Sequence, residues 1–197
     1  MIPRHLILGA VVMLMLALGM GFYAWHMRGG ARQPETASSQ PVAPPVSGPT
    51  EPVTLYIAYD DGGVLRARSA RIPLPAGRQE RAEELLRALL NVYLDKSSPH
   101  LLGADSEIRD VYLVDPGLAV IDLNSAFADG HRSGVLVEEL TVASLVETLS
   151  ANIPGIARAK ILVDGKERDT LAGHLDLTNF FDVATFSQIA LQLQNTR

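Results

Sequence analysis

Residues 108–124 read IRDVYLVDPGLAVIDLN, and this stretch is the most informative part of the sequence about the fold. Two runs rich in valine, isoleucine and leucine, at 108–114 and 118–123, flank the triplet Asp115-Pro116-Gly117. β-Branched residues favour strands, whereas proline and glycine favour turns. The stretch therefore predicts a β-hairpin whose tip lies at residues 115–117.

Further strands and helices alternate on both sides of this hairpin. Apolar residues recur at helical spacing in QERAEELLRALLNVYL, which predicts a first helix, and in the run from Gly134 to Ala151, which predicts a second. Ser133 is a good N-cap for the second helix. Three more β-rich runs predict strands at 54–59, 65–74 and 157–163. Beyond Asn179, the run DVATFSQIALQL predicts a short terminal helix.

The charge of the chain excludes several classes of ligand. From residue 53 onward the chain has 14 Lys and Arg against 20 Asp and Glu, a formal charge of −6. Nucleic acids and anionic lipids require a basic patch, so neither is expected as a ligand of this region. The chain has no cysteine, which excludes disulfides, cysteine-ligated zinc and a lipidated cysteine anchor.

The N-terminal region, residues 1–28, predicts a membrane anchor. Residues 6–25 contain no charged side chain, and an uninterrupted helix of that length spans about 30 Å of hydrocarbon. Phe22, Tyr23 and Trp25 stand at its end, where aromatic side chains meet the headgroups. A cleaved signal peptide is the alternative, although its apolar run is usually shorter. The short N-terminal tail favours a domain outside the cytoplasm.

Residues 29–52 predict an extended tether between this anchor and a globular domain at 53–197. The tether holds six of the twelve prolines together with glycine, serine and threonine, and it has almost no large apolar side chain. Such a composition does not offset the entropy of ordering, and proline stiffens the chain. The expected role of the tether is to hold the domain away from the membrane.

Polar residues close to the predicted turns are the candidates for chemistry. The Asp164-Gly165 turn leads toward His174 and Asp176, which would share one face of an extended strand. Together with His131 they are the candidate ligands or catalytic groups, but metal sites need three or four ligands, and no recognised metal-binding spacing is present. A structural role is favoured for this pair, as it is for Asp122 and Asn124 at the end of a strand.

Glu138 and Glu139 fall in the first turns of the second helix. Acidic side chains there complement the helix dipole, so both are expected on a solvated face. Neither a nucleophile elbow nor a phosphate-binding glycine loop occurs in the chain. These patterns predict a protein without catalytic groups, cofactor or metal.

Three segments carry a resemblance to a known family. DVYLVDPGLAVIDLNSAFADG, EELTVASLVETLSA and IARAKILVDGKERDTLAGHLDLTNFF resemble the GerMN domain of sporulation and germination proteins. The resemblance implies an α+β domain with a small, mostly antiparallel sheet and two main helices on one side. It also implies a binding or assembly module rather than an enzyme. The candidate partner-binding or signature residues are Asp122, Asn124, Asp164, Gly165, Gly173, His174 and Asp176.

The leading hypothesis is a single-pass protein of the bacterial cytoplasmic membrane whose extracytoplasmic domain binds or scaffolds envelope proteins. Peptidoglycan and a second copy of the chain are alternative partners, and the acidic charge favours a cationic or neutral surface. The rival hypothesis is an envelope hydrolase or metal-dependent enzyme that uses His174, Asp176 and His131.

Overall fold

The computed structural model describes residues 15, 48–114 and 116–186. The chain divides into two units, residues 1–45 and 46–197, and the description below concerns the second. The predicted anchor, apart from Met15, and the predicted tether up to residue 47 lie outside the described residues. Within the described part, no helix combines the length and hydropathy that crossing a membrane requires.

The first half of the domain is a hairpin followed by a helix. Strands β1 (Thr50–Tyr59) and β2 (Val64–Pro73) pair antiparallel, and the short 3-10 helix η1 (Asp60–Gly62) joins them. Alternate β1 residues Val53, Leu55 and Ile57 are buried, as expected of a strand with one covered face. Helix α2 (Arg78–Leu94) follows and buries its predicted leucine stripe.

The second half contains the hairpin predicted from residues 108–124. Strands β3 (Ile108–Val114) and β4 (Leu118–Leu123) pair antiparallel, and the short helix α3 (Ser125–Asp129) and the long helix α4 (Val135–Asn152) follow. Strand β5 (Arg158–Val163) returns parallel to β4, and β6 (Phe181–Asp182) pairs antiparallel with β5. The resulting sheet has the order β3-β4-β5-β6.

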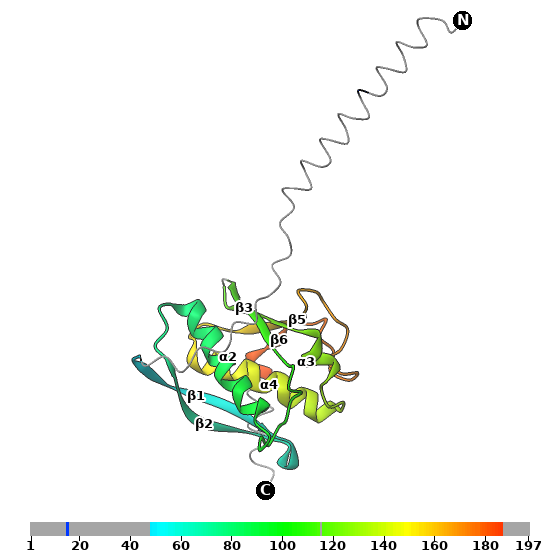
Figure 1. Ribbon diagram of the computed structural model, residues 1–197, viewed down its shortest axis with the longest axis horizontal. Coiled ribbons are helices and arrows are strands. Elements are labelled where there is room, and N and C mark those ends of the chain that lie inside the picture. Colours follow the sequence, from blue (N-terminus) through cyan, green and yellow to red (C-terminus); the bar gives the residue numbers. More distant parts are fainter. Residues whose placement is uncertain (1–14, 16–47, 115, 187–197) are drawn as a thin grey trace, which may run out of the picture. The chain divides into compact units, whose positions relative to one another are not determined.

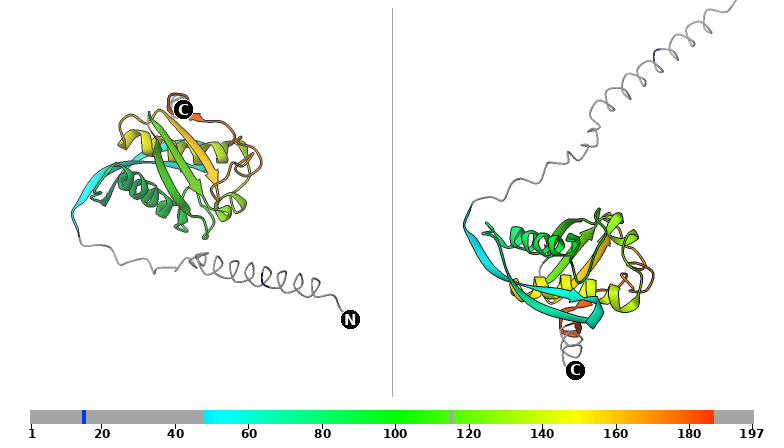
Figure 2. Two further views of the ribbon diagram at one scale, coloured as in Figure 1. Left: turned by 90° about the horizontal axis from the view of Figure 1, so that it is seen from above. Right: turned by 60° about the horizontal axis from the view of Figure 1, so that its bottom comes forward.

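The two long helices lie between the two sheets. Figures 1 and 2 show the β1–β2 hairpin on one side of α2 and α4 and the four-stranded sheet on the other. The predicted α+β class and the mostly antiparallel sheet are confirmed, but the prediction of a single sheet is wrong. The reason lies in α4, whose residues from Leu140 to Leu149 are all buried, because a helix that is buried on every side needs cover from both sheets.

Helices α2 and α4 also close the free edge of strand β1. The Thr54 N–H donates to the Asn152 side chain at 3.0 Å, and the Tyr56 N–H donates to the Thr148 hydroxyl at 3.0 Å. The Ala58 N–H donates to the Tyr93 hydroxyl at 2.9 Å. Backbone donors of β1 that face away from β2 are therefore bonded by helix side chains.

Two predicted segments differ from the structure near the C-terminus. Residues 166–180 form turns and isolated bridges rather than a strand, because only Val163 pairs with Lys166 and Thr170 with Asp176. Residues 183–186 are helical, and the rest of the predicted terminal helix lies outside the described residues.

Candidate functional site

Glu138 is the centre of the most elaborate polar arrangement in the domain. It lies in the first turn of α4 with no exposed surface. Its Oε1 accepts from the Gly134 N–H at 3.1 Å, and its Oε2 accepts from the N–H groups of Ala172, His174 and Leu175 at 3.0, 3.1 and 2.9 Å. The carboxylate thus fastens the loop at 172–175 to the start of α4.

The backbone donors hold this carboxylate in its ionised form. Burial, the largest single influence, would raise the pKa of Glu138, but the N–H groups of Leu175, Ala172 and Gly134 outweigh it and lower the pKa to about 2. The expectation that Glu138 points into solvent is wrong. A glutamate in the first turn of a helix fits both a solvated and a buried position, so the helix pattern alone does not distinguish them.

His174 contacts Glu138 and Ser133 but does not connect them. The His174 Nδ1 lies 3.0 Å from Glu138 Oε1 and 3.2 Å from Ser133 Oγ. In a serine–histidine–carboxylate triad the two ring nitrogens are used separately, one for each partner. Here both partners share Nδ1, so while that nitrogen donates to Glu138 it does not accept the Ser133 proton. The predicted N-cap role of Ser133 is also wrong, because Gly134 is the N-cap of α4.

His174 and Asp176 do not act together. The predicted strand face is absent, and Asp176 instead accepts hydrogen bonds from the Thr178 N–H and hydroxyl at 2.7 and 2.6 Å and from the Asn179 amide at 2.8 Å. The Thr178 hydroxyl is the main reason that the pKa of Asp176 is lowered. Asp176 therefore stabilises a turn of its own.

Gly173 is required by backbone geometry. Its φ of +110° lies in the region that side chains rarely adopt. Its N–H donates to the Thr170 hydroxyl at 3.1 Å. This glycine shapes the loop that Glu138 binds.

The remaining signature residues meet at the end of β4 and β5. Asp122, which is buried, accepts from the Gly165 N–H at 2.7 Å, and Asp164 binds Arg109 at 2.9 Å. Asp164 and Gly165 have φ of 51° and 72°, which confirms the predicted tight turn. Asn124 caps α3 through the Phe127 N–H at 2.8 Å. The structure therefore separates the signature residues into two groups, and each group positions backbone.

A second polar cluster, not predicted from the sequence, joins His100 to His131 through Thr141. His100 Nδ1 lies 2.6 Å from Asp60 Oδ1, and both histidine Nε2 atoms lie 2.7 Å from the Thr141 hydroxyl. His131 Nδ1 lies 2.6 Å from the Arg132 carbonyl. The cluster connects the β1–β2 turn and two loops to α4. His131 therefore has a structural role here, whereas the rival hypothesis had grouped it with His174.

The hydroxyl of Thr141 limits how protons are arranged in this cluster. It has one proton, for which the Val137 carbonyl at 2.9 Å competes with the two ring nitrogens, so at least one of the two Nε2 atoms must itself carry a proton and donate to the hydroxyl. Burial lowers the pKa of His100, although the hydrogen bond that its ring makes to the Asp60 carboxylate acts in the opposite direction. Burial also lowers the pKa of His131. No group of three or more His, Asp or Glu side chains in the described residues is placed to hold a metal ion.

The outer face of the four-stranded sheet carries exposed apolar side chains. Cross-strand register places Tyr112 beside Val120 and Val114 beside Leu118, on the face opposite the helices. Tyr112 and Val114 are 50% and 46% exposed. No described helix lies over this face (Figure 2, left). We refer to Tyr112, Val114 and their strand neighbours as the outer sheet face.

The loop after β5 covers the other end of this face. Lys160 of β5 is buried, and its Nζ donates to the carbonyl oxygens of Leu177 and Thr178 at 3.1 and 2.6 Å. The charged groups of Lys160 and Arg158 lie over the ring of Phe180, which is half exposed. Among the described residues, the β3–β4 side of the sheet is therefore the more exposed part of this face.

Comparisons with known proteins identify the fold and the family. A family model described as Germane, sporulation and spore germination, matches residues 54–169. No curated protein sequence matches the chain.

Three solved structures share 20% sequence identity with the chain. The tandem GerMN domains of the sporulation protein GerM from Bacillus subtilis align with a TM-score of 0.50 over 68% of this chain and 46% of that one. The first GerMN domain of the same protein aligns with a TM-score of 0.48 over 68% and 96%. A candidate lipoprotein from Clostridium perfringens aligns with a TM-score of 0.45 over 72% and 92%. At this identity, the tandem structure indicates a shared fold only.

Proposed function

The chain belongs to the Germane family of sporulation and spore germination domains, and from this premise we propose that it is a non-catalytic module of the bacterial cell envelope that binds another protein. The observation that carries the proposal is the outer sheet face, which no described helix covers. Large apolar side chains left exposed together commonly mark a protein contact site. Tyrosine in particular supplies a large contact area together with a hydroxyl that forms hydrogen bonds.

The use of the polar side chains supports a role without catalysis. The carboxylate of Glu138 is occupied by four backbone N–H groups, and the shared His174 nitrogen does not relay a proton from Ser133 to Glu138. Asp122 and Asp176 hold turns. Each of these groups has a structural task that accounts for its residue type.

The sequence outside the described residues supports the location. The uncharged run at 6–25 has the length of a membrane-spanning helix, and the proline-rich residues 29–52 follow it. A domain held at a membrane by such a tether meets membrane-bound partners at a raised effective concentration. We therefore propose a domain outside the cytoplasmic membrane that contacts an envelope protein.

Photo-crosslinking in intact cells tests this function. A photoreactive amino acid is placed at Tyr112, at Val114 and, as a matched control, at Arg68, which is exposed on β2 of the other sheet. A discrete adduct with another protein is expected from positions 112 and 114 and not from 68. Absence of any adduct at 112 and 114, with the domain correctly folded, would overturn the proposal.

His174→Ala separates this function from the hydrolase alternative. The side chain of His174 is 44% exposed, so its removal leaves the backbone bonds to Glu138 in place. The crosslinked adduct at Tyr112 is expected to persist in this variant. The hydrolase alternative would be favoured if purified wild-type protein had a hydrolytic activity and the variant lost both this activity and the adduct.

A further inference from the structure

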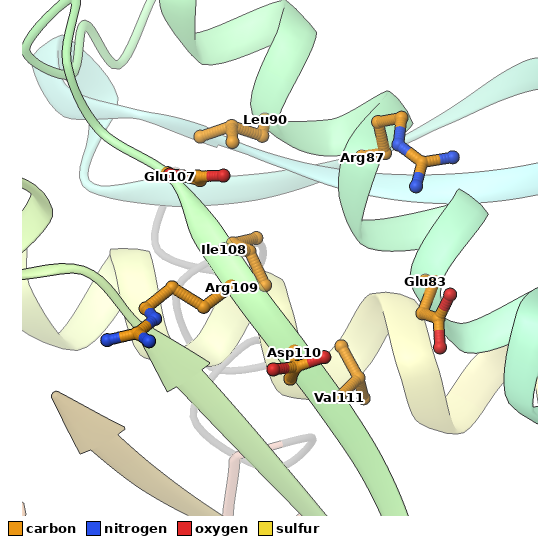
Figure 3. A pocket seen from close by; sticks show the side chains of 8 residues that line it. All are labelled: Glu83, Arg87, Leu90, Glu107, Ile108, Arg109, Asp110 and Val111. Carbon is orange, nitrogen blue, oxygen red and sulfur yellow. The ribbon is translucent and has the colours of Figure 1, made fainter. Parts of the chain in front are cut away.

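A groove runs between helix α2 and the free edge of strand β3. Its volume is about 270 Å³, and Figure 3 shows the side chains that line it. Strand β3 is the terminal strand of its sheet among the described strands. The lining residues are Glu83, Arg87 and Leu90 of α2 and the segment Glu107–Val111.

Backbone groups of β3 point outward from the sheet edge beside one end of this groove. The Gln79 side chain donates to the Val111 carbonyl and accepts from the Leu113 N–H, at 3.3 Å in the latter case. Both backbone groups therefore face away from β4. Because the N–H and C=O of one strand residue point to the same side, the Val111 N–H and the Leu113 carbonyl face the same way. Gln79 occupies two of the positions that an added strand would use.

The charges of the groove favour a basic occupant. Three carboxylates, those of Glu83, Glu107 and Asp110, line it. The two arginines of the lining are engaged with other acids: Arg87 binds Glu84, and Arg109 binds Asp164 and lies 3.8 Å from Asp122. The groove therefore presents an excess of negative charge to an incoming segment.

The strand geometry also specifies the side-chain pattern of the occupant. Residues of an added strand alternate between the two faces of the sheet. On the inner face they would meet the partly buried side chains of Leu90 and Ile108, which suit small apolar groups. On the outer face they would lie beside Asp110 and Tyr112, which suit basic groups.

We propose that the groove between α2 and β3 binds an extended segment of a partner protein, in which basic and apolar residues alternate, as an additional strand on β3. The proposal rests on the proposed function and specifies how the partner is held. Main-chain hydrogen bonds give such a complex its affinity, and the alternating side chains give it specificity. The outer sheet face continues from this edge, so one partner extends across both.

Binding of defined peptides to the full-length protein tests the proposal. The probe is a fluorescein-labelled heptapeptide of alternating lysine and valine, measured by fluorescence anisotropy. One reference peptide has proline in place of the central valine, which removes a main-chain donor. Another has glutamate in place of lysine. Binding of the lysine–valine peptide alone is expected; equal binding of the proline peptide would overturn strand addition, because charge would then suffice.

Two substitutions on the protein locate the binding site. Glu107→Lys reverses one carboxylate of the groove, and we expect it to weaken probe binding about fivefold, the scale of one partly exposed charge pair. Asp61→Lys makes the same charge change in the exposed turn between β1 and β2, and we expect an effect within about twofold. Equal weakening by both variants would overturn the assignment to the groove.

Removal of the Gln79 side chain should strengthen probe binding, whereas Glu107→Lys should weaken it. Gln79→Ala frees the Val111 carbonyl and the Leu113 N–H, and we expect probe affinity to rise about fivefold because the peptide no longer competes with the side chain. Changes in the NMR amide signals of Val111 and Leu113 should accompany binding. Weaker binding by Gln79→Ala, or unchanged signals at these two amides, would overturn strand addition on β3.

The outcomes separate this inference from the proposed function. If crosslinking at Tyr112 captures a protein while the lysine–valine peptide fails to bind, the groove proposal is wrong and the binding function stands. If the peptide binds and no protein is captured, the groove stands and partner binding at the outer sheet face fails. If light scattering shows self-association that Glu107→Lys abolishes and the peptide fails to bind, the occupant is a second copy of the chain and the proposal is overturned.

Discussion

The free edges of strands β1 and β3 differ in how completely side chains cover them. On β1, the N–H groups of Thr54, Tyr56 and Ala58 donate in turn to side chains of α4 and α2. On β3, one side chain, Gln79, binds two backbone groups, and a groove continues beside it. Both strands lie at the end of their sheet among the described strands, so position in the sheet does not explain the difference.

The difference follows from where each strand lies relative to the helices. Strand β1 packs against α4, and its edge bonds are partly buried at Thr54 and Tyr56 and fully buried at Ala58, where an unbonded N–H costs about 1–3 kcal/mol. The edge of β3 lies beside the exposed start of α2 and is more open, because the bond between Gln79 and the Leu113 N–H is exposed, although Val111 itself is buried. Buried edges therefore need dedicated side chains, whereas an exposed edge stays available to a partner. The predictions below test this contrast, from the largest expected effect to the smallest.

Asn152→Ala should be the most destabilising change at the β1 edge. The Asn152 amide accepts from the Thr54 N–H and donates to the Thr54 and Thr148 carbonyls, both at 2.7 Å. Loss of these bonds should lower the free energy of unfolding by about 3 kcal/mol, because β1 groups are left unbonded. Urea unfolding, monitored by circular dichroism, measures this loss of free energy. The control Asn179→Ala removes an exposed amide and should cost under about 0.5 kcal/mol.

Tyr93→Phe tests the same edge at its buried end. Ala58 and Tyr93 are almost completely buried, so the Ala58 N–H would lose its acceptor without gaining water. We expect a loss of about 2 kcal/mol in unfolding free energy at neutral pH. Tyr112→Phe, at a half-exposed tyrosine, is the matched control and should be nearly neutral. Equal effects of the two substitutions would mean that the β1 edge is not specifically closed.

The pH dependence of stability should report the same buried hydroxyl. Burial is the main reason that the pKa of Tyr93 is raised, from 10.0 to about 12. Between these values the unfolded chain has lost the proton and the folded chain has kept it, so stability falls as pH rises from about 10 to 12. This part of the alkaline loss should be absent from Tyr93→Phe. If stability fell equally with rising alkaline pH in wild type and variant, the raised pKa of Tyr93 would not be its cause.

Thr148→Val removes one bond from the middle of the edge. The Thr148 hydroxyl is fully buried and accepts from the Tyr56 N–H, while valine keeps the shape of the side chain. The expected cost is about 1.5 kcal/mol, between that of a mean hydrogen bond and that of an unbonded donor. Thr178→Val, at an exposed threonine, should cost less in the same denaturation experiment. A smaller cost at 148 than at 178 would contradict burial of this edge.

Local patterns predicted the elements of this fold but not how the edges are covered. The hairpin at 108–123, both long helices and the turn at Asp164-Gly165 follow from turn residues and apolar spacing within a few positions. Asn152 lies 98 residues from Thr54, and Glu138 lies 34 residues or more from the loop it binds. Contacts of such separation are set by the packing of the layers. No periodicity along the chain records them.

The contacts of the candidate site could not be predicted from local patterns either. His174 and Asp176 were paired because strand geometry places alternate residues on one face. The segment forms turns instead, so Glu138 rather than Asp176 became the partner of His174. The helix pattern did not distinguish the fully buried Glu138 from its partly buried neighbour Glu139. The apolar neighbours gave no clearer signal, because Val135 and Leu136 are exposed in the same turn of α4.

Gln79→Ala should have the smallest effect on stability of the four edge substitutions. Gln79 lies on the exposed start of α2, and its bond to the Leu113 N–H is exposed, so water replaces that bond when the side chain is removed. Alanine also favours the helix slightly. We therefore expect a change within about 0.5 kcal/mol in urea unfolding, although the same substitution strengthens peptide binding. A loss as large as that of Asn152→Ala would show that Gln79 closes β3 as Asn152 closes β1, and the contrast between the two edges would disappear.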